Sequence, residues 1–317
     1  MLSADTTCVG FMDFGGPEVL GLHRVSMPAP GEREILVEVE AATVNPADIF
    51  LRSGGLQSMM NGTPPYYGGL ELAGTIVAAG SNSRWKIGEK VAGLTLFLPS
   101  GRGAHCRHVV INDDSAATIP SSLNMAQAAA VPMSGITARL AIDKARPYGR
   151  RVAITGAIGS VGSIALRLAL LEGLEPIAVV RRSQFDRARK LGAKHIVDAE
   201  DMVSQMRGIA PSGVDAVIDC ALMMQANEAV IRDGGFFGGL RPFDFTFGRG
   251  IVTGLIGMPE YLREQVKLQE LLTLAGKGEF PISIASVFPP AQAAEAHRLL
   301  EKGGLGGRIS LDFSGIS

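Results

Sequence analysis

The sequence has few cysteines, few aromatic residues and almost no net charge, and two of these shortages exclude whole classes of protein. Its 317 residues contain three cysteines, too few and too scattered for a disulfide framework, and this suits a reduced compartment. A formal net charge of -1 gives no footprint for a polyanion, so nucleic acid is not expected as a partner. No apolar run is long enough to span a bilayer, and the N-terminus shows no signal segment. We therefore expect a cytoplasmic protein that does not enter a membrane.

The sequence is rich in glycine and poor in aromatic residues. The chain has 40 glycines and 6% aromatic residues, and 46% of it is hydrophobic. This composition is typical of an α/β protein with many tight turns. The length is sufficient for two domains, each with a sizeable core.

A glycine-rich turn near the middle of the chain is the most informative stretch. A short apolar run at 152–155 predicts a buried parallel strand. Gly156, Gly159 and Gly162 follow, and an Ala/Leu pattern with helical period then runs to Leu171. Such a turn offers free backbone N–H groups and the positive end of a helix dipole to a phosphate. Glycines also occur in turns that bind nothing, but the strand before and the helix after favour a dinucleotide site.

The remaining patterns divide the chain into a β-rich part and an alternating part. Up to about residue 122, turns rich in glycine and proline separate short strands, which predicts a small barrel or sandwich. These strands are expected at 35–41, 74–80, 87–93 and 108–111. Helices are then expected at 125–131 and 136–142, the first capped by Ser122 or Asn124.

After the glycine turn, strands and helices alternate, which predicts an open parallel sheet. Strands are expected at 177–180, 195–198, 214–219 and from 235, with helices at 185–191 and 226–232. Two later helices, 259–275 and 290–301, and a strand at 308–312 do not extend this alternation. We assign them to the first domain.

Ten motifs occur in the order found in one family. They lie at 16–20, 34–39, 44–48, 52–54, 69–74, 136–138, 155–162, 191–193, 214–219 and 307–309. As a set they resemble the medium-chain dehydrogenase/reductase superfamily, in its zinc-free, zeta-crystallin-like quinone oxidoreductase branch. The resemblance implies an α/β fold in which a doubly wound Rossmann sheet joins a β-rich GroES-like catalytic domain. It places the GroES-like domain at 1–122 with 259–317, and the NADP-binding Rossmann domain at 123–258.

The residues that bind zinc in relatives of this superfamily are replaced here. Zinc-dependent members carry a cysteine where this chain has Asn45, and a Gly-His-Glu motif where it has Gly69, Leu70 and Glu71. Leucine cannot bind zinc. The run 105–108, His-Cys-Arg-His, offers other candidate ligands, but we expect strand alternation to place Cys106 on the face opposite both histidines. We therefore expect no metal.

The residues after the second strand of the parallel sheet predict the cofactor. NAD sites place an acidic residue there, whereas this chain has Arg181, Arg182 and Ser183, with no acidic residue before Asp186. Guanidinium groups pair well with a 2′-phosphate, which predicts NADPH (NADP+). The alternative is a solvated basic turn.

The resemblance also implies individual site residues. Asn45 and Thr137 would lie near the nicotinamide and act in catalysis; alternatively, Asn45 is a turn residue before Pro46, and Thr137 bonds its own helix backbone. Tyr67 is a third catalytic candidate, with packing as its alternative, while Phe50 stands where this branch often has tyrosine. Arg308 would reach the cofactor or lie at the surface. The complete set of expected cofactor contacts is Asn45, Thr137, Thr155, Gly156, Ala157, Gly159, Ser160, Val161, Gly162, Arg181, Arg182, Ser183, Gly239, Leu240, Ile256 and Arg308.

The function that follows is NADPH-dependent hydride transfer to a small quinone or α,β-unsaturated carbonyl, with no side chain assigned as general acid. Three alternatives remain open: an alcohol or ketone reductase, a biosynthetic enoyl-thioester reductase, and a non-catalytic NADPH-binding protein. The apolar segment 251–256 is a candidate edge strand, and the resemblance implies a homodimer through it.

Overall fold

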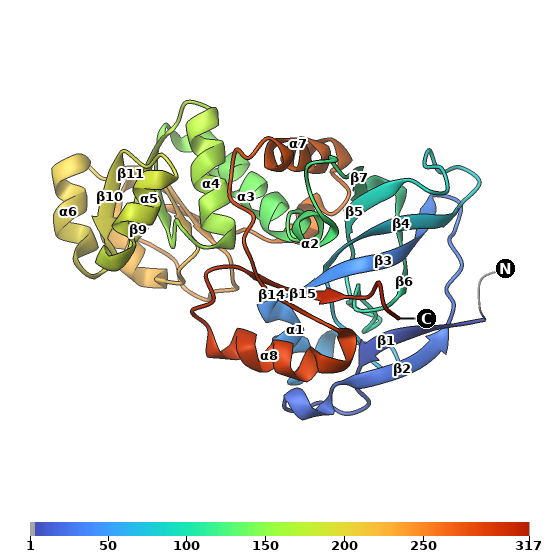
Figure 1. Cartoon of the computed structure of the whole chain (residues 1–317). Coiled ribbons are helices and arrows are strands. Elements are labelled where there is room, and N and C mark those ends of the chain that lie inside the picture. Colours follow the sequence, from blue (N-terminus) through green and yellow to red (C-terminus); the bar gives the residue numbers. More distant parts are fainter. Residues whose placement is uncertain (1–3, 317) are drawn as a thin grey trace. The chain divides into compact units, whose positions relative to one another are not determined.

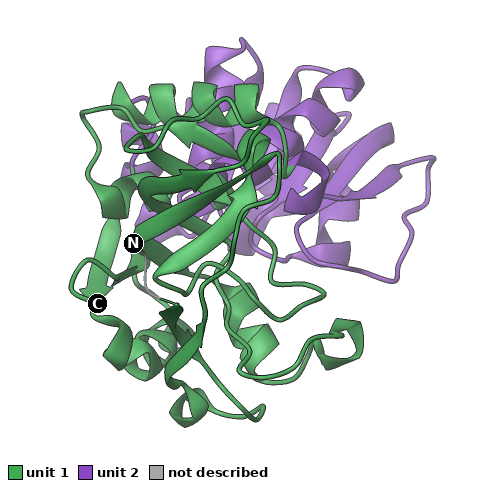
Figure 2. Cartoon of the chain, turned by 90° about the vertical axis from the view of Figure 1, so that its right-hand side faces the viewer, with its two compact units in different colours: residues 1–133, 262–277, 282–317 green, residues 134–261, 278–281 purple. Residues whose placement is uncertain are grey.

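The computed structural model describes residues 4–316, which form two compact units (Figures 1 and 2). Within the described residues, unit 1 comprises 4–133, 262–277 and 282–316, and unit 2 comprises 134–261 and 278–281. The first break lies later than the predicted one at 122, because α2 (Met125–Ala129) packs on strands of unit 1. Residues 278–281 join unit 2, where Glu279 pairs with Arg167 at 2.9 Å.

Unit 1 is built on one seven-stranded sheet and a separate two-stranded ribbon. The ribbon pairs β1 (Asp5–Gly10) with β2 (Gly21–Ser26). The sheet has the order β14-β15-β3-β4-β5-β7, and β6 also pairs with β3. Its strands are β3 (Glu34–Val44), β4 (Glu71–Ala79), β5 (Lys90–Leu94), β6 (His108–Asn112), β7 (Ala116–Thr118), β14 (Ile284–Phe288) and β15 (Arg308–Asp312). The four predicted strands of the β-rich part and the strand at 308–312 are therefore confirmed.

Side chains satisfy backbone groups at the start of α2 and at the end of α7 (Gln265–Gly276) in unit 1. The α-helices are α1 (Pro46–Arg52), α2, α7 and α8 (Ala293–Lys302), and the 3-10 helices are η1 (Pro17–Val19), η2 (Gln57–Met59), η3 (Asp113–Ser115) and η9 (Pro290–Gln292). Asn124 caps α2 by accepting from the Gln127 N–H at 2.9 Å. Ser122 instead donates to the Gly276 carbonyl at 2.8 Å.

The prediction of one helix over 259–275 is wrong. The segment forms η8 (Met258–Tyr261) and then α7, with a break between them. Side chains anchor the two pieces separately. The Tyr261 hydroxyl donates to Asp143 within unit 2, and Arg263 pairs with Asp114 within unit 1.

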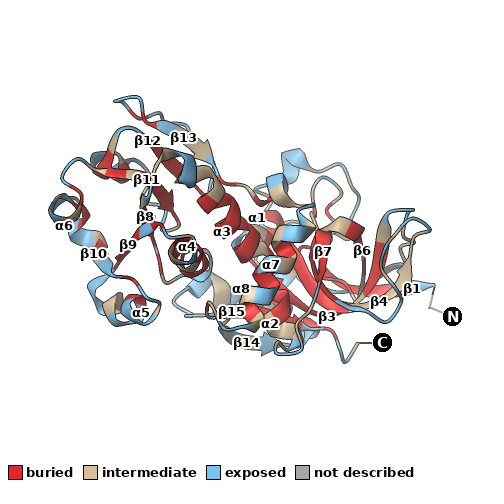
Figure 3. Ribbon diagram, turned by 90° about the horizontal axis from the view of Figure 1, so that it is seen from above, coloured by how far each residue is buried: buried red, intermediate tan, exposed pale blue. Residues whose placement is uncertain are grey.

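Unit 2 is a six-stranded sheet in which every pairing is parallel. Its order is β10 (His195–Asp198), β9 (Glu175–Val180), β8 (Arg151–Thr155), β11 (Val214–Asp219), β12 (Ile231–Gly239) and β13 (Val252–Leu255). Counted from its first strand, this is the 3-2-1-4-5-6 order of a Rossmann sheet. The α-helices are α3 (Pro132–Ala145), α4 (Ser160–Leu171), α5 (Phe185–Lys190) and α6 (Met202–Ile209). Buried residues gather along the strands and on α3 and α4 (Figure 3), which confirms the predicted α/β fold.

One predicted helix of unit 2 differs from the expectation in its type and in where it ends. Residues 226–232 were expected to be helical, but η7 (Met224–Val230) is a 3-10 helix, and β12 already begins at Ile231. The Asp219 carboxylate holds the start of this segment by accepting from the N–H groups of Met223 and Met224. Three short 3-10 helices, η4 (Arg146–Tyr148), η5 (Arg182–Gln184) and η6 (Ala199–Asp201), complete the unit. None of the helices in the described part of the chain has the length and apolar character needed to cross a bilayer.

Candidate functional site

The glycine-rich turn joins β8 to α4 and leaves backbone donors available at the start of the helix. Gly156 has a φ of 58°, in the left-handed region that favours glycine. The first intrahelical bond of α4 runs from the Ser163 N–H to the Gly159 carbonyl at 2.9 Å. The N–H groups of Ser160, Val161 and Gly162 therefore precede the helical ladder, as at any helix N-terminus.

Gly162 allows the turn to close tightly. A Cβ at this position would lie 2.3 Å from the Gly156 carbonyl oxygen, closer than any side chain tolerates. The helix start is thus held directly against the end of β8. This geometry fits the pyrophosphate of a dinucleotide, which needs close backbone approach and the positive end of a helix dipole.

Thr155 lies at the point where the strand order of the sheet reverses. Its hydroxyl donates to Asp219 Oδ1 at 2.6 Å and accepts from the Ala221 N–H at 2.9 Å. The side chain therefore ties the carboxyl ends of β8 and β11 together. Open α/β sheets bind their ligands at such a switch point. Asp219 was not predicted as a site residue, although its place at the end of an apolar strand was a usable signal.

The basic turn after β9 is exposed but not wholly free. The three residues Arg181, Arg182 and Ser183 are all exposed. Arg182 Nε donates to Asp198 Oδ2 at 3.2 Å, while 79% of the Arg182 side chain remains accessible. Asp198 ends β10 directly beside β9, a neighbour that the sequence alone did not indicate. Both guanidinium groups can therefore still meet an anion from solvent.

The other predicted residues of unit 2 are mostly buried. The Ile256 N–H donates to the Gly239 carbonyl at 2.8 Å, at the carboxyl ends of β12 and β13. Leu240 follows directly, and all three lie at the edge of the sheet that carries the glycine turn. Ala157 and Thr137 are buried within the same unit.

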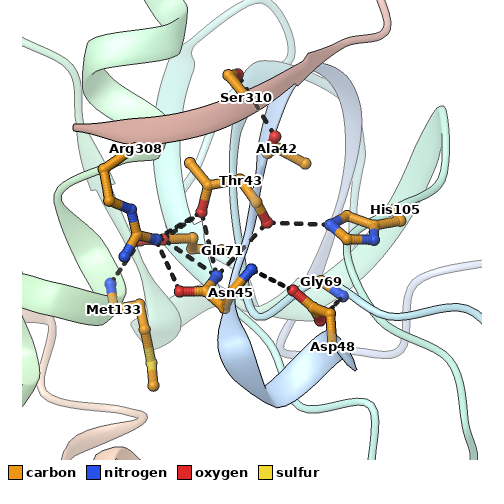
Figure 4. Close-up of polar contacts among 10 residues, drawn as sticks. All are labelled: Ala42, Thr43, Asn45, Asp48, Gly69, Glu71, His105, Met133, Arg308 and Ser310. Carbon is orange, nitrogen blue, oxygen red and sulfur yellow. Dashed lines mark hydrogen bonds and ion pairs between the residues drawn. The ribbon is translucent and has the colours of Figure 1, made fainter. Parts of the chain in front are cut away.

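A buried polar cluster in unit 1 consists of Thr43, Asn45, Glu71, Met133 and Arg308, which come from four separate stretches of chain (Figure 4). At its centre Glu71 is fully buried and accepts from the Met133 N–H at 2.7 Å, from the Thr43 hydroxyl and from Arg308 Nη2. Arg308 Nη2 also donates to Thr43 Oγ1 and to Asn45 Oδ1, each at 2.8 Å. The cluster therefore pairs a buried carboxylate with a guanidinium and fixes one amide.

Two predicted residues take definite places in this cluster. Arg308 is not a surface residue, since 13% of its side chain is accessible. Asn45 is the buried N-cap residue of α1, and its N–H donates to Asp48 Oδ2 at 2.7 Å. Asp48 Oδ1 accepts in turn from the Gly69 N–H at 2.6 Å. Glu71 and Asp48 were not predicted as site residues, although Asn-x-x-Asp at 45–48 is a recognisable helix-start pattern.

Tyr67 lies within the hydrophobic core of unit 1. Burial, and then the nearby thiols of Cys106 and Cys8, raise the pKa of its phenol. Tyr67 therefore keeps its phenol neutral and packs among apolar side chains of the core. The catalytic role of Tyr67 stays a prediction, and this environment does not favour it.

The prediction that Cys106 faces away from both histidines is wrong for His108. The Thr6 hydroxyl lies 3.9 Å from Cys106 Sγ and 2.9 Å from His108 Nδ1, so both side chains reach the same hydroxyl. Residues two apart in an extended segment share a face. His105 points elsewhere, with Nε2 at 3.0 Å from the Thr43 carbonyl. Residues 4–316 contain no group of three or more His, Cys, Asp or Glu side chains that could hold a metal ion.

A second buried polar group in unit 1 contains His297. The Arg52 guanidinium lies 3.5 Å from His297 Nδ1 and can only donate, so Nδ1 accepts and Nε2 carries the proton. Nε2 is buried and has no hydrogen-bond partner among the described residues. Burial, followed by His105 and Arg52, lowers the pKa of His297 to about 3.

This environment predicts a loss of stability in mild acid. Below its ordinary value of 6.5, the histidine takes up a proton in the unfolded chain but not in the folded one. The contribution of neutral His297 to the free energy of unfolding is therefore fully present above pH 6.5 and is lost as the pH falls toward 3. Between pH 7 and pH 5 the free energy of unfolding should fall by about 2 kcal/mol through this residue. Urea unfolding at pH 7 and pH 5 measures the change in the free energy of unfolding. His297→Gln should remove the part of about 2 kcal/mol due to this residue, whereas His195→Gln, at an exposed site, should leave the change intact.

Comparisons with known proteins agree with this architecture. Residues 31–142 match the alcohol dehydrogenase GroES-like domain, and residues 191–310 match the zinc-binding dehydrogenase family. The chain is 30% identical to alcohol dehydrogenase 2 of Caenorhabditis elegans over 73% of each protein. It is 28% identical to quinone oxidoreductase of Sus scrofa over 94% of this chain and 95% of that one. The solved structure of an alcohol dehydrogenase superfamily protein from Novosphingobium aromaticivorans has the same fold, with a TM-score of 0.85, 24% identity and coverage of 97% and 99% of the two chains.

Proposed function

Because the chain belongs to the medium-chain dehydrogenase/reductase superfamily, in its quinone oxidoreductase-like branch, we propose that it is an NADPH-dependent reductase of quinones or α,β-unsaturated carbonyls that works without zinc. Members of this family are oxidoreductases that use nicotinamide cofactors. The observation that carries the proposal is the closed glycine turn of unit 2, with exposed guanidinium groups at the neighbouring strand end.

The residues of unit 2 bind and orient the cofactor in this proposal. The N–H groups of Ser160 and Val161 hold the pyrophosphate, and Arg181 and Arg182 hold the 2′-phosphate. When bound, NADPH supplies the hydride for reduction of the substrate. No side chain is assigned as the proton donor, and water supplies that proton.

The polar cluster of unit 1 fixes the orientation of Asn45. Since Arg308 donates to its carbonyl oxygen at 2.8 Å, the amide nitrogen Nδ2 must point toward Thr43 and Glu71, which accept from it at 3.2 and 3.5 Å. A side chain held this way is preorganised and costs little entropy on ligand binding. We infer that it hydrogen-bonds the cofactor or the substrate oxygen.

Independence from zinc rests on the residues at the ligand positions. Asn45 and Leu70 stand where zinc-dependent members have cysteine and histidine, and both side chains are buried. Neither provides the thiolate or imidazole that zinc prefers. The match to a family described as zinc-binding therefore concerns the fold, in our proposal, and not a metal.

A substrate panel tests this function against its competitors. Chelator-dialysed protein would be given NADPH with quinones, enones, enoyl thioesters and ketones, and NADPH oxidation would be followed. Turnover of quinones or enones supports the proposal. Turnover of ketones alone favours an alcohol or ketone reductase, and turnover of enoyl thioesters alone favours a biosynthetic reductase. Tight NADPH binding without turnover of any substrate would identify a non-catalytic binding protein.

The role of Arg181 and Arg182 in cofactor preference can be tested by removing both guanidinium groups. In the double variant Arg181→Ala with Arg182→Ala, kcat/KM for NADPH should fall about 10- to 100-fold, since two exposed charge-assisted bonds, one of them shared with Asp198, together contribute about 1.5–3 kcal/mol. The value for NADH should stay within about threefold. Arg187→Ala, an exposed arginine of α5, is the matched control. Equal losses with both cofactors would contradict the assignment.

The free edge of the parallel sheet supports a homodimer. Among residues 4–316, β13 pairs only with β12, and Val252 and Leu255 on it are exposed. An apolar edge of this kind favours pairing with a second copy. Light scattering should give twice the mass of the chain, and a monomer at micromolar concentration would reject the dimer.

We also propose a cytoplasmic location, because the three cysteines are free and suit a reducing compartment.

A further inference from the structure

Three phenylalanines stack on one another in the loop that follows β12. Phe243, Phe245 and Phe247 occupy alternate positions, with Asp244 and Thr246 between them. The ring centroids of successive phenylalanines lie 4.9 and 5.1 Å apart, with interplanar angles of 29° and 27°. The segment forms no strand, so ring stacking takes the place of backbone pairing in ordering it.

The stack rises from the core of unit 2 toward its surface. Phe237, fully buried in β12, contacts all three rings at 5.0–5.8 Å between centroids. Phe247 is buried, whereas Phe245 and Phe243 keep part of their surface accessible. Phe243 and Phe245 pack against the same core cluster and also keep part of their surface accessible, so the outer part of the stack presents aromatic surface to solvent.

Phe243 lies at the carboxyl edge of the sheet, where this fold binds ligands. A Cβ on Gly239 would come within 2.8 Å of Phe243 Cε1, so glycine at the end of β12 makes room for the ring. At the end of the neighbouring strand β11, Leu222 is 40% exposed, and Met223 packs against the same core cluster as Phe243 and Phe245. Met223, Phe243 and Phe245 are therefore half-buried apolar side chains on one core cluster, and their thioether and ring surfaces can adapt to a flat ligand.

We propose that Phe243 is a specificity-determining residue that stacks on the planar ring of a polycyclic quinone. This inference rests on the proposed function and narrows its substrate class. A quinone ring is electron-poor, and the negative face of a phenylalanine ring attracts it in an offset stack. The reaction adds a hydride from NADPH and a proton from water to the quinone, giving hydroquinone and NADP+.

Steady-state kinetics of Phe243→Leu tests the stacking. With 9,10-phenanthrenequinone the KM should rise about five- to tenfold, since an aromatic pair contributes about 0.5–1.5 kcal/mol beyond area burial. The KM for 2-cyclohexenone, which has no aromatic face, and the Kd for NADPH should stay within about twofold. Phe243→Trp should restore the wild-type KM, and Phe288→Leu, at a half-buried ring of unit 1, is the matched control.

The alternatives give different results. Equal changes of KM for both substrates, or no change for either, would overturn the proposal. A weaker Kd for NADPH with an unchanged quinone KM would also overturn it, because the ring would then contact the cofactor. If the wild-type protein turns over no substrate of the panel, the proposed function fails. Calorimetric binding of phenanthrenequinone to wild-type protein and to Phe243→Leu then decides the stacking separately.

Discussion

Gly162→Ala should weaken the binding of NADPH by about 100-fold while the chain still folds. The new methyl group would lie 2.3 Å from the Gly156 carbonyl oxygen and 2.9 Å from its carbon. Both atoms belong to backbone, so α4 must move away from the end of β8. Overpacking of this kind costs about 1–3 kcal/mol, and the displaced N–H groups no longer converge on the pyrophosphate. We expect the Kd for NADPH, measured by fluorescence titration, to rise by about 100-fold.

Gly208→Ala separates this effect from a general cost of replacing glycine. Gly208 lies inside α6 in the same unit, and a Cβ there meets nothing within 4 Å. Alanine should be neutral or stabilise the helix by up to about 1 kcal/mol. Thermal unfolding of both variants without cofactor would show how much of the loss is structural. A Gly162→Ala variant that binds NADPH within threefold of wild type would refute the phosphate role of the turn.

Glu71→Ala should cause the largest loss of stability. It removes the carboxylate that accepts from Arg308, Thr43 and the Met133 N–H, and leaves a guanidinium buried without its counter-charge. Breaking a buried pair from one side costs about 3–5 kcal/mol. Urea unfolding monitored by circular dichroism measures the change.

Two further variants identify the cause of that loss. In Glu71→Leu with Arg308→Met no charge is left behind, so the double variant should be more stable than Glu71→Ala. Glu38→Ala breaks a more exposed pair with Arg107 and should cost about 1 kcal/mol or less. If the double variant is as unstable as Glu71→Ala, the buried charge is not the cause.

The features predictable from the sequence are those set by neighbours in the chain. The apolar run of β8, the glycines after it and the Ala/Leu pattern of α4 are contiguous, so one window contains the whole motif. Asn124 and Gln127 likewise satisfy each other across a single helical turn. In each case the partners lie within a few residues, and local geometry decides the structure.

The polar cluster of unit 1 could not be predicted in the same way. Arg308 meets Thr43 and Asn45 because β15 pairs antiparallel with β3, with Ile309 opposite Val44. Nothing near residue 308 specifies that register. The same holds for β2, whose largely exposed residues show little apolar alternation, and for Asp198, which reaches Arg182 through the pairing of β10 with β9.

The position of β15 between β14 and β3 has a consequence for synthesis on the ribosome. Ala42 and Ser310, which bond across this pairing, are 268 residues apart in the sequence. All of unit 2 is translated between them, and its own strands need nothing from the last segment. Unit 1 therefore begins first and is completed last, and the nascent chain must carry residues 41–44 of β3 without their partner strand until β15 leaves the exit tunnel.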